Sequence, residues 1–240
     1  MKNIESWVPT NIIPTDTGWA PNKAYIAPWS TYITDLECAA YLEVLKGHVH
    51  GDLLDLGAGT LPYYGVYRDF VTSVTASDWQ NSHHETGHID VISDLNEGIP
   101  FKSDAFDTVL LADVLEHTHE PQNVFNESSR VLRRGGKLLL FVPFMYGIHE
   151  EPFDYYRYTS HELERLSQEA GLRVIDIKPF GGGPDVIIDT AQKLIGDREM
   201  MQEVFANIFA AVNRSGVLNG LRQKHANKIP LGYTLVSEKI

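Results

Sequence analysis

The stretch "LLDLGAGTLPYY" (residues 53–64) joins an apolar run to a glycine turn. The run contains Asp55, and Gly57 and Gly59 follow it closely. Because glycine adopts positive φ and lets the backbone approach a ligand, this pattern predicts a strand, a ligand-binding turn and then a helix. An acidic residue about twenty positions further along is expected to accept hydrogen bonds from a ribose, and Asp78 fits this spacing. The stretch therefore predicts a nucleotide-type cofactor at the carboxyl end of the strand.

Outward from this turn, short apolar runs alternate with helical segments along the chain. The runs are "DLLDL" (52–56), "SVTAS" (73–77), "DVIS" (90–93), "FDTVLLA" (106–112), "KLLLFVP" (137–143), "RVIDIKPF" (173–180) and "YTLVSEK" (233–239). Because apolar runs without alternation are typical of strands buried on both faces, they predict a doubly wound α/β fold with a mostly parallel sheet. One intervening helix is predicted to begin at Pro121 and to end at Gly135 and Gly136.

The two ends of the chain differ from this pattern. Residues 1–30 are rich in Pro, Trp, Thr and Asn and show no periodicity, which predicts an arm or lid on a main domain of residues 31–240. A helical insertion is predicted at about 185–226. One of its faces is apolar, and we favour packing against the sheet, with a lid over the acceptor or a contact between subunits as the alternatives. This face carries Val204, Phe205, Ile208, Phe209 and Val212.

Composition narrows the class of protein. The net charge of −12 over 240 residues disfavours nucleic acid and anionic lipid as partners, since both repel an acidic protein. No apolar run is long enough to span a bilayer, and the N-terminus lacks the apolar core of a signal peptide, so we expect a cytoplasmic protein. The single cysteine, Cys38, cannot form an internal disulfide. The stretch "SHHETGH" (82–88) has three histidines, which we interpret as a solvated loop rather than a metal site.

Several motifs follow the glycine turn in a fixed order. They are "SDLNEGIPFKSDAFD" (93–107), "VLEH" (114–117), "RVLRRGG" (130–136) and "KLLLFVPF" (137–144). Together with "DLGAG" (55–59) they make the chain resemble class I S-adenosylmethionine-dependent methyltransferases, notably the type 11 group, from about Gly51 to Gly182 and again at the last strand. The resemblance implies a seven-stranded Rossmann-like sheet whose last strand is antiparallel and lies beside the sixth. It also implies adenosylmethionine as cofactor, whose cationic sulfonium and ammonium suit carboxylates.

The resemblance implies roles for particular residues around this cofactor. The turn would line the methionine and ribose, the acid after the second strand would accept the ribose hydroxyls, and the next acid would flank the adenine. Two residues after the fourth strand would border the methionine end. The implied cofactor-binding residues are Asp55, Gly57, Ala58, Gly59, Asp78, Trp79, Asp94, Leu95, Ala112 and Asp113.

The segment "FVPFMYGIHEEPFDYYRYTSHEL" follows the fifth strand at the edge where ligands bind. Its pattern H-x-x-P-x-D-Y-x-R-Y-T is similar to one subset of the type 11 group, many of whose members belong to polysaccharide or secondary-metabolite pathways. His149 is the candidate base, with a hydrogen bond that pins the loop as an equal alternative. His117 is a second candidate, more for shaping the site than as a base. The candidate substrate-binding residues are Tyr146, His149, Asp154, Tyr155 and Arg157.

Two structural interpretations of this loop stay beside the functional one. Asp154 and Arg157 are expected to form an ion pair that shapes the loop, in preference to direct substrate contact. Thr159 and Glu162 are expected to form a capping box at the start of the next helix. No metal ligands are assigned, although a magnesium site that uses His149 and nearby acids such as Glu150, Glu151 and Asp154 is a minority interpretation.

The sequence thus predicts methyl transfer from adenosylmethionine to a small molecule, with a hydroxyl of a sugar, glycan or secondary metabolite as the leading acceptor. A nitrogen or carbon acceptor, or a non-catalytic adenosylmethionine-binding protein, is the alternative. A nicotinamide-dependent oxidoreductase is disfavoured, because Pro62 occupies the third small position of the dinucleotide fingerprint. An oligomer through the late helices is a further expectation.

Overall fold

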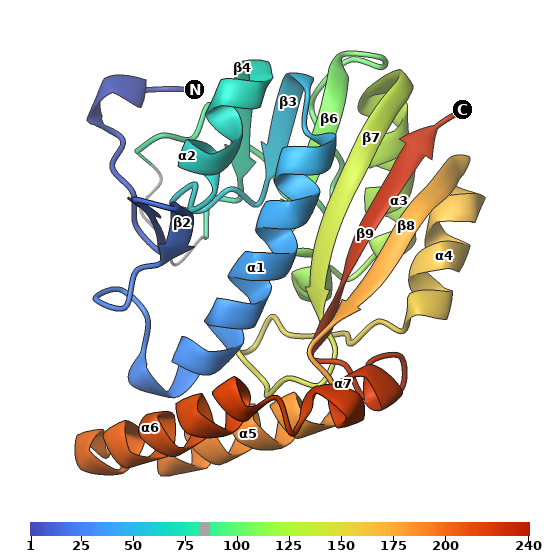
Figure 1. The fold of residues 1–240 in the computed structure, drawn as a ribbon. Helices are drawn as coiled ribbons and strands as arrows, with labels where there is room; N and C mark the ends of the chain where they lie inside the picture. Colours follow the sequence, from blue (N-terminus) through green and yellow to red (C-terminus); the bar gives the residue numbers. More distant parts are fainter. Residues whose placement is uncertain (82–86) are drawn as a thin grey trace.

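The computed structural model of the chain describes residues 1–81 and 87–240, apart from some side chains between residues 199 and 214. At its centre is a seven-stranded sheet with the order β5-β4-β3-β6-β7-β9-β8, in which β9 runs antiparallel to both of its neighbours (Figure 1). This confirms the predicted doubly wound fold and its antiparallel last strand. The strands are β3 (Gly51–Leu56), β4 (Val71–Asp78), β5 (Val91–Ile92), β6 (Phe106–Ala112), β7 (Leu132–Pro143), β8 (Leu172–Phe180) and β9 (Gly232–Lys239).

Helices cover both faces of the sheet, as the non-alternating strands require. Helix α1 (Thr31–His48) lies on one face, and α3 (Pro121–Val131) and α4 (Ser160–Glu169) lie on the other (Figure 1). Leu53 packs in the cluster that includes α1, whereas the adjacent Leu54 packs in the cluster that includes α3 and α4. Because both faces are buried, the successive residues Leu53 and Leu54 are both apolar.

The end of α3 differs from the prediction. The helix ends at Val131 and β7 begins at Leu132, so the expectation that the two glycines end the helix is wrong. The last carbonyls of the helix accept hydrogen bonds from outside it, since Asp104 N–H donates to Arg130 O and Ala105 N–H donates to Val131 O. Leu132 then pairs with Phe106, and the glycines lie in an irregular stretch of β7 beside β6.

The N-terminal arm consists of short elements. They are η1 (Ile4–Ser6), a hairpin of β1 (Ile12–Thr15) and β2 (Gly18–Pro21), and η2 (Pro28–Ser30). The α-amino group of Met1 donates to Val74 O at 3.0 Å, and the arm thereby reaches the β4 side of the sheet. Between β3 and β4 lie α2 (Tyr64–Tyr67) and η3 (Arg68–Phe70), and η4 (Leu115–His117) follows β6.

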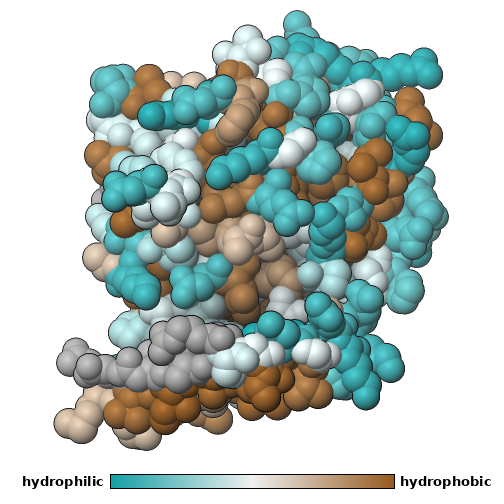
Figure 2. All heavy atoms as spheres, in the orientation of Figure 1, coloured by the Kyte–Doolittle hydropathy of each residue, from teal (hydrophilic) through white to brown (hydrophobic). Residues whose placement is uncertain are grey.

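The late helices are α5 (Gly183–Ile195), α6 (Glu199–Ser215) and α7 (Asn219–His225), which cross the molecule below the carboxyl ends of the parallel strands (Figure 1). Val204 and Ile208 of α6 are 55% and 54% exposed, so the favoured interpretation of sheet packing is wrong for this face. Helix α6 instead contacts α5 and η2, and apolar side chains lie along this edge of the molecule (Figure 2). Within the described ranges, every helix is too short or too polar to cross a bilayer.

Candidate active site

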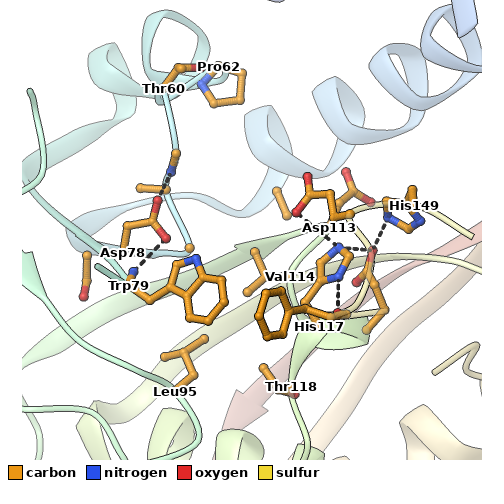
Figure 3. A pocket seen from close by; sticks show the side chains of 18 of the residues that line it. Thr60, Pro62, Asp78, Trp79, Leu95, Asp113, Val114, His117, Thr118 and His149 are labelled. Atoms are coloured by element: carbon orange, nitrogen blue, oxygen red, sulfur yellow. Dashed lines mark hydrogen bonds and ion pairs between the residues drawn. The ribbon is translucent and has the colours of Figure 1, made fainter. Parts of the chain in front are cut away.

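A cavity of about 400 Å³ lies at the carboxyl edge of the sheet. Residues after β3, β4, β6 and β7 line it, which is the place where doubly wound folds bind ligands. One half is built around the glycine turn and the end of β4, and the other around η4 and the loop after β7 (Figure 3). None of the described lining residues is a lysine or an arginine.

The glycine turn brings bare backbone to the cavity. Gly57 has a φ of 67°, and a β-carbon at this position would lie 2.5 Å from Cγ2 of Val114. The N–H of Gly59 donates to Oδ2 of Asp78 at 3.1 Å, and the N–H of Trp79 donates to Oδ1 of the same carboxylate at 2.8 Å. These bonds hold a buried carboxylate at the end of β4, directly beside the turn (Figure 3).

The structure brings most of the predicted cofactor-binding residues together. Those that line the cavity are Gly57, Ala58, Gly59, Asp78, Trp79, Asp94, Leu95, Ala112 and Asp113. Asp55 is not among the lining residues, because it is buried behind the turn and accepts a hydrogen bond from the Tyr67 hydroxyl at 2.7 Å. Burial raises the pKa of Asp55, the Tyr67 bond lowers it and the nearby Asp78 carboxylate raises it, and the pKa that results is about 7.

The other half of the cavity is polar and rich in carboxylates. Asp113 stands at the end of β6 with a φ of 55°, and its carboxylate accepts a hydrogen bond from Tyr41 at 2.8 Å. Burial raises the pKa of Asp113 well above its usual value, and Glu37 and Glu116 raise it further. Glu37 comes from α1, and burial raises its pKa to about 7.

The two candidate catalytic histidines face each other in this half. Their ring centroids are 4.8 Å apart. The Nε2 atoms of His117 and His149 lie 3.8 Å and 3.7 Å from Oε1 of Glu116, whose side chain is fully buried (Figure 3). Burial alone would lower the pKa of His149, but Glu116 and Asp154 outweigh it, so the pKa lies above its usual value. The structure therefore places one buried carboxylate between two imidazoles.

The loop after β7 is shaped by an ion pair. Arg157 donates to Asp154 through both terminal nitrogens, at 2.5 Å and 2.8 Å, and also to the carbonyl of Gly147 at 2.9 Å. The Asp154 carboxylate in turn accepts the backbone N–H of His149 at 2.9 Å. Neither member of the pair lines the cavity, and neither does Tyr155, whereas Tyr146 does. The geometry of Asp154 and Arg157 is that of the expected loop-shaping pair.

Sequence reasoning did not single out Glu37 or Glu116 as site residues. Glu116 stands in "VLEH" directly after a buried strand, so its position at the ligand edge of the sheet was a usable signal. Glu37 lies between apolar residues of α1 and carries no local signal of this kind. The predicted solvated loop "SHHETGH" lies for the most part in residues 82–86, outside the described residues.

Comparison with known proteins indicates which class of enzyme has this fold and site. Residues 54–140 match the family model of a methyltransferase domain, type 11. A stretch of 146 residues is 29% identical to the uncharacterized protein MJ1123 of Methanocaldococcus jannaschii, over 56% of this chain and 71% of that protein.

Solved structures show the same fold with different chemistry. A geranyl diphosphate C-methyltransferase from Streptomyces coelicolor, in complex with Mg²⁺, geranyl diphosphate and S-adenosyl-L-homocysteine, is similar with a TM-score of 0.58 at 16% identity, over 97% of this chain and 89% of that chain. The [4+2]-cyclase SpnF is similar with a TM-score of 0.54 at 19% identity, over 86% of this chain and 82% of that chain. At such identities the similarity concerns the fold.

The strand order, the glycine turn at the carboxyl edge and the family match define a class I S-adenosylmethionine-dependent methyltransferase. Within this class residues 54–140 match the type 11 model, and methyltransferases of this class use S-adenosylmethionine as cofactor. The cavity fits this cofactor, because carboxylates and bare backbone line the half beside the turn while no lysine or arginine does so among the described residues.

Proposed function

We propose that this methyltransferase acts on a hydroxyl group of a small molecule, such as a sugar, a glycan or a secondary metabolite. The observation that carries the proposal is the pair of imidazoles around Glu116 in the cavity half opposite the glycine turn. Adenosylmethionine, when bound, supplies a methyl carbon whose bond to sulfur breaks, with its electron pair left on sulfur, as the acceptor oxygen bonds to that carbon. The acceptor's proton must leave, so an oxygen acceptor needs a group that assists proton removal.

The glycine-turn half is proposed to hold the cofactor. Asp78 is fixed by the two backbone N–H groups and presents its carboxylate to ribose hydroxyls. Gly57 and Gly59 let the backbone approach the methionine part, while Asp94 and Leu95 border the adenine. Asp113 borders the methionine end. Asp55 acts from behind the turn, through the position of Gly57, and not by contact with the cofactor.

The opposite half is proposed to hold the acceptor. His149 assists removal of the acceptor's proton, in the simplest form as the base itself, and Glu116 orients its ring and that of His117. Tyr146 forms one wall and is itself held by the Lys193 ammonium, 3.8 Å from the ring centroid. This contact joins α5 to the acceptor half, which supports a lid role for the late helices.

An amine is the second candidate acceptor, and a specific observation favours it. The acceptor half presents Glu37, Glu116 and Glu150 to the cavity, with Asp113 at its border with the cofactor half, and no lysine or arginine lines it among the described residues. Carboxylates attract a cationic amine. A neutral amine needs little help from a base, so the two acceptor classes differ in their dependence on His149.

The N-terminal arm and the late helices complete the proposal. Asn11 of the arm lines the cavity, and the hydroxyl groups of Thr10 and Thr60 lie 3.2 Å apart, so the arm is placed to cover the cofactor. Apolar side chains of α5 and α6 are exposed, and a contact between subunits through these helices would bury them (Figure 2). Light scattering at several protein concentrations tests the oligomer.

Thermal unfolding with candidate cofactors tests the cofactor part of the proposal. S-adenosylhomocysteine at one hundred times its dissociation constant stabilises a native protein by about 2.7 kcal/mol. For a chain of this size, that corresponds to a rise in melting temperature of roughly 5–10 °C. NAD at the same concentration is the control and should leave the melting temperature unchanged. A rise with NAD and none with S-adenosylhomocysteine would contradict the assignment.

Turnover tests the acceptor part. Transfer of labelled methyl from adenosylmethionine is measured on panels of polyols, phenols and amines, with the wild type and with His149→Ala. For a hydroxyl acceptor we expect His149→Ala to lower kcat by roughly 10²–10⁴-fold. A variant that retains the wild-type rate on an amine would favour the second candidate. Cofactor binding without transfer to any acceptor in the panels would favour a non-catalytic role.

A further inference from the structure

We propose that Glu116, His117 and His149 form a binding site for a divalent transition-metal ion in the acceptor half of the cavity. Each of the three side chains offers one ligand atom, and these atoms lie within 4.8 Å of one another. All three line the cavity. The three residues come from two separate segments of the chain, and folding brings them together.

The spacing of the ligand atoms is too long for hydrogen bonds and suits a shared ion. Nε2 of His117 and Nε2 of His149 lie 3.8 Å and 3.7 Å from Oε1 of Glu116, beyond the range of an N–H···O bond. Two protein ligands that each lie about 2.0–2.1 Å from one ion are separated by roughly 3–4 Å, depending on the angle at the ion. These two separations match ligation of a common ion, and all three ligand atoms lie within 4.8 Å of one another.

The carboxylate of Glu116 is a buried group that requires a partner. Its side chain is 0% exposed, and neither of its oxygens has a hydrogen-bond donor among the residues that the structure describes. A buried carboxylate without a partner is unfavourable, and such groups in native proteins usually have a donor or a metal ion. An ion in the cavity satisfies this carboxylate from the side at which the two imidazoles already lie.

The second ring nitrogen of each histidine is held in the manner typical of metal ligands. Nδ1 of His117 lies 2.7 Å from the carbonyl oxygen of Phe153, and Nδ1 of His149 lies 3.3 Å from both the carbonyl oxygen of Gly147 and Oδ2 of Asp154. Metal-ligating histidines commonly donate one ring N–H to a carbonyl or carboxylate, which leaves the other nitrogen free to bind. With the proton on Nδ1 of each ring, both Nε2 lone pairs face the Glu116 carboxylate.

The fold holds this set of ligands rigidly. Glu116 and His117 belong to η4 directly after β6, and His149 follows β7, which pairs with β6 in parallel. The two segments are tied together, since the backbone N–H of Tyr155 donates to the carbonyl of Glu116 at 2.9 Å. The ligands therefore stand on the ends of two neighbouring strands.

The ligand types indicate which ion binds. Two imidazoles and one carboxylate suit ions of the series from Mn²⁺ to Zn²⁺, whereas Mg²⁺ and Ca²⁺ prefer oxygen ligands alone. Three protein ligands also leave coordination positions open for an exchangeable ligand. Glu150 can serve as a further ligand from the rim, since its Oε2 lies 3.9 Å from Nε2 of His117.

The role of the ion rests on the proposed function, although its binding does not. A hydroxyl bound at an open position of the ion has a lowered pKa, so its proton passes to water and the oxygen is prepared for attack. The metal-bound Nε2 of His149 cannot accept that proton. The ion then replaces His149 as the group that assists proton removal, and His149 acts as a ligand.

Metal retention tests the site without an acceptor. Untagged protein is stripped with a chelator, loaded separately with Mn²⁺, Co²⁺, Zn²⁺, Mg²⁺ or Ca²⁺, passed through gel filtration and measured by mass spectrometry for bound metal. We expect one Zn²⁺ or Co²⁺ per chain and no retained Mg²⁺ or Ca²⁺. Glu116→Gln and His149→Ala should each lower the affinity at least roughly tenfold. His161→Ala, an exposed histidine of α4 away from the cavity, is the matched control and should bind as the wild type does.

The results separate the metal site from the proposed function. Failure of the wild type to retain any of the transition ions, or equal retention by Glu116→Gln and the wild type, would overturn the site. Zinc-edge X-ray absorption of the wild type needs no variant, and a spectrum without imidazole scattering would also overturn it. The thermal shift with S-adenosylhomocysteine, measured on the stripped protein, reports on cofactor binding alone. Its loss would argue against the proposed function and would leave the metal result intact.

Discussion

The backbone at Gly57 admits only glycine, for two separate reasons. Its φ of 67° is unfavourable for residues with a side chain, and a β-carbon would lie 2.5 Å from Cγ2 of Val114. We expect Gly57→Ala to lower the free energy of unfolding by roughly 1–2 kcal/mol from the backbone alone, with more from the contact. It should also weaken S-adenosylhomocysteine binding, because the turn that borders the cavity has to move to relieve the contact with Val114. Calorimetry of unfolding and of binding measures both effects.

A second glycine supplies the control for this prediction. Gly47 lies in the last turn of α1, and a β-carbon there would meet nothing within 4 Å. Gly47→Ala should leave cofactor binding unchanged and should stabilise the protein by up to about 1 kcal/mol, through helix propensity. Wild-type affinity in Gly57→Ala would show that the close approach of the turn is not needed for the cofactor.

At the scale of elements, the loop after β7 is a structured unit. The Arg157 guanidinium holds the pKa of Asp154 at about 2, and the same carboxylate fixes the backbone N–H of His149. The helix that follows, α4, is capped by Thr159, whose hydroxyl accepts the N–H of Glu162 at 3.2 Å. In a complete capping box the Glu162 carboxylate would accept the backbone N–H of Thr159. Here that carboxylate accepts hydrogen bonds from Arg165 instead. The loop is therefore anchored at both ends.

Weakening the Arg157 pair should loosen the loop and leave the cofactor half unchanged. Lysine cannot reproduce the two parallel bonds to Asp154, so Arg157→Lys should speed hydrogen exchange of the His149 amide. The affinity for S-adenosylhomocysteine should stay within about twofold, because the cofactor half is built on β3 and β4. Arg165→Lys is the control, because Arg165 forms an exposed ion pair with Glu162 on α4. Unchanged exchange in Arg157→Lys would contradict the role of the pair.

Elements with a strong local pattern could be predicted from the sequence, and elements that depend on tertiary contacts could not. The strand predicted at 106–112 is β6 as observed, because the short apolar run at 109–112 is typical of a buried strand. The end of α3 was missed, because the sheet captures Leu132 through Phe106 and overrides the glycine signal. The apolar face of α6 was misplaced, because periodicity shows that a face is apolar and does not show what covers it.

At the scale of the whole molecule, the site joins segments that are far apart in the sequence. The glycine turn and Asp78 were predictable, since their chemistry and spacing form a local pattern. Glu37 reaches the cavity from α1, and Glu116 meets His149 only because β6 and β7 are neighbours in the sheet. Which strands lie next to each other is a property of the sheet topology. The sequence therefore predicted where the acceptor half lies, and it did not predict which side chains meet there.

The buried carboxylate of Asp55 links the stability of the whole molecule to pH. Burial raises the pKa of Asp55 from 3.8 to about 7, so the folded chain holds this proton more tightly than the unfolded chain does. The stabilisation is fully present below the unfolded pKa and is lost as pH rises through the folded pKa, that is between about pH 4 and pH 7.

Asp55→Asn removes this ionisation and keeps the side chain's size and an acceptor for the Tyr67 hydroxyl. We expect the variant to exceed the wild type in free energy of unfolding at pH 8, by on the order of 1–3 kcal/mol, and the difference to vanish towards pH 4. Denaturant unfolding at pH 4, 6 and 8 measures it. Asp69→Asn is the control, because it makes the same change of charge at a side chain that is 78% exposed. Its difference from the wild type in free energy of unfolding should not depend on pH. A variant less stable than the wild type at pH 8 would show that the ionised carboxylate is stabilised by its surroundings, in which case the turn that it supports would require the charge.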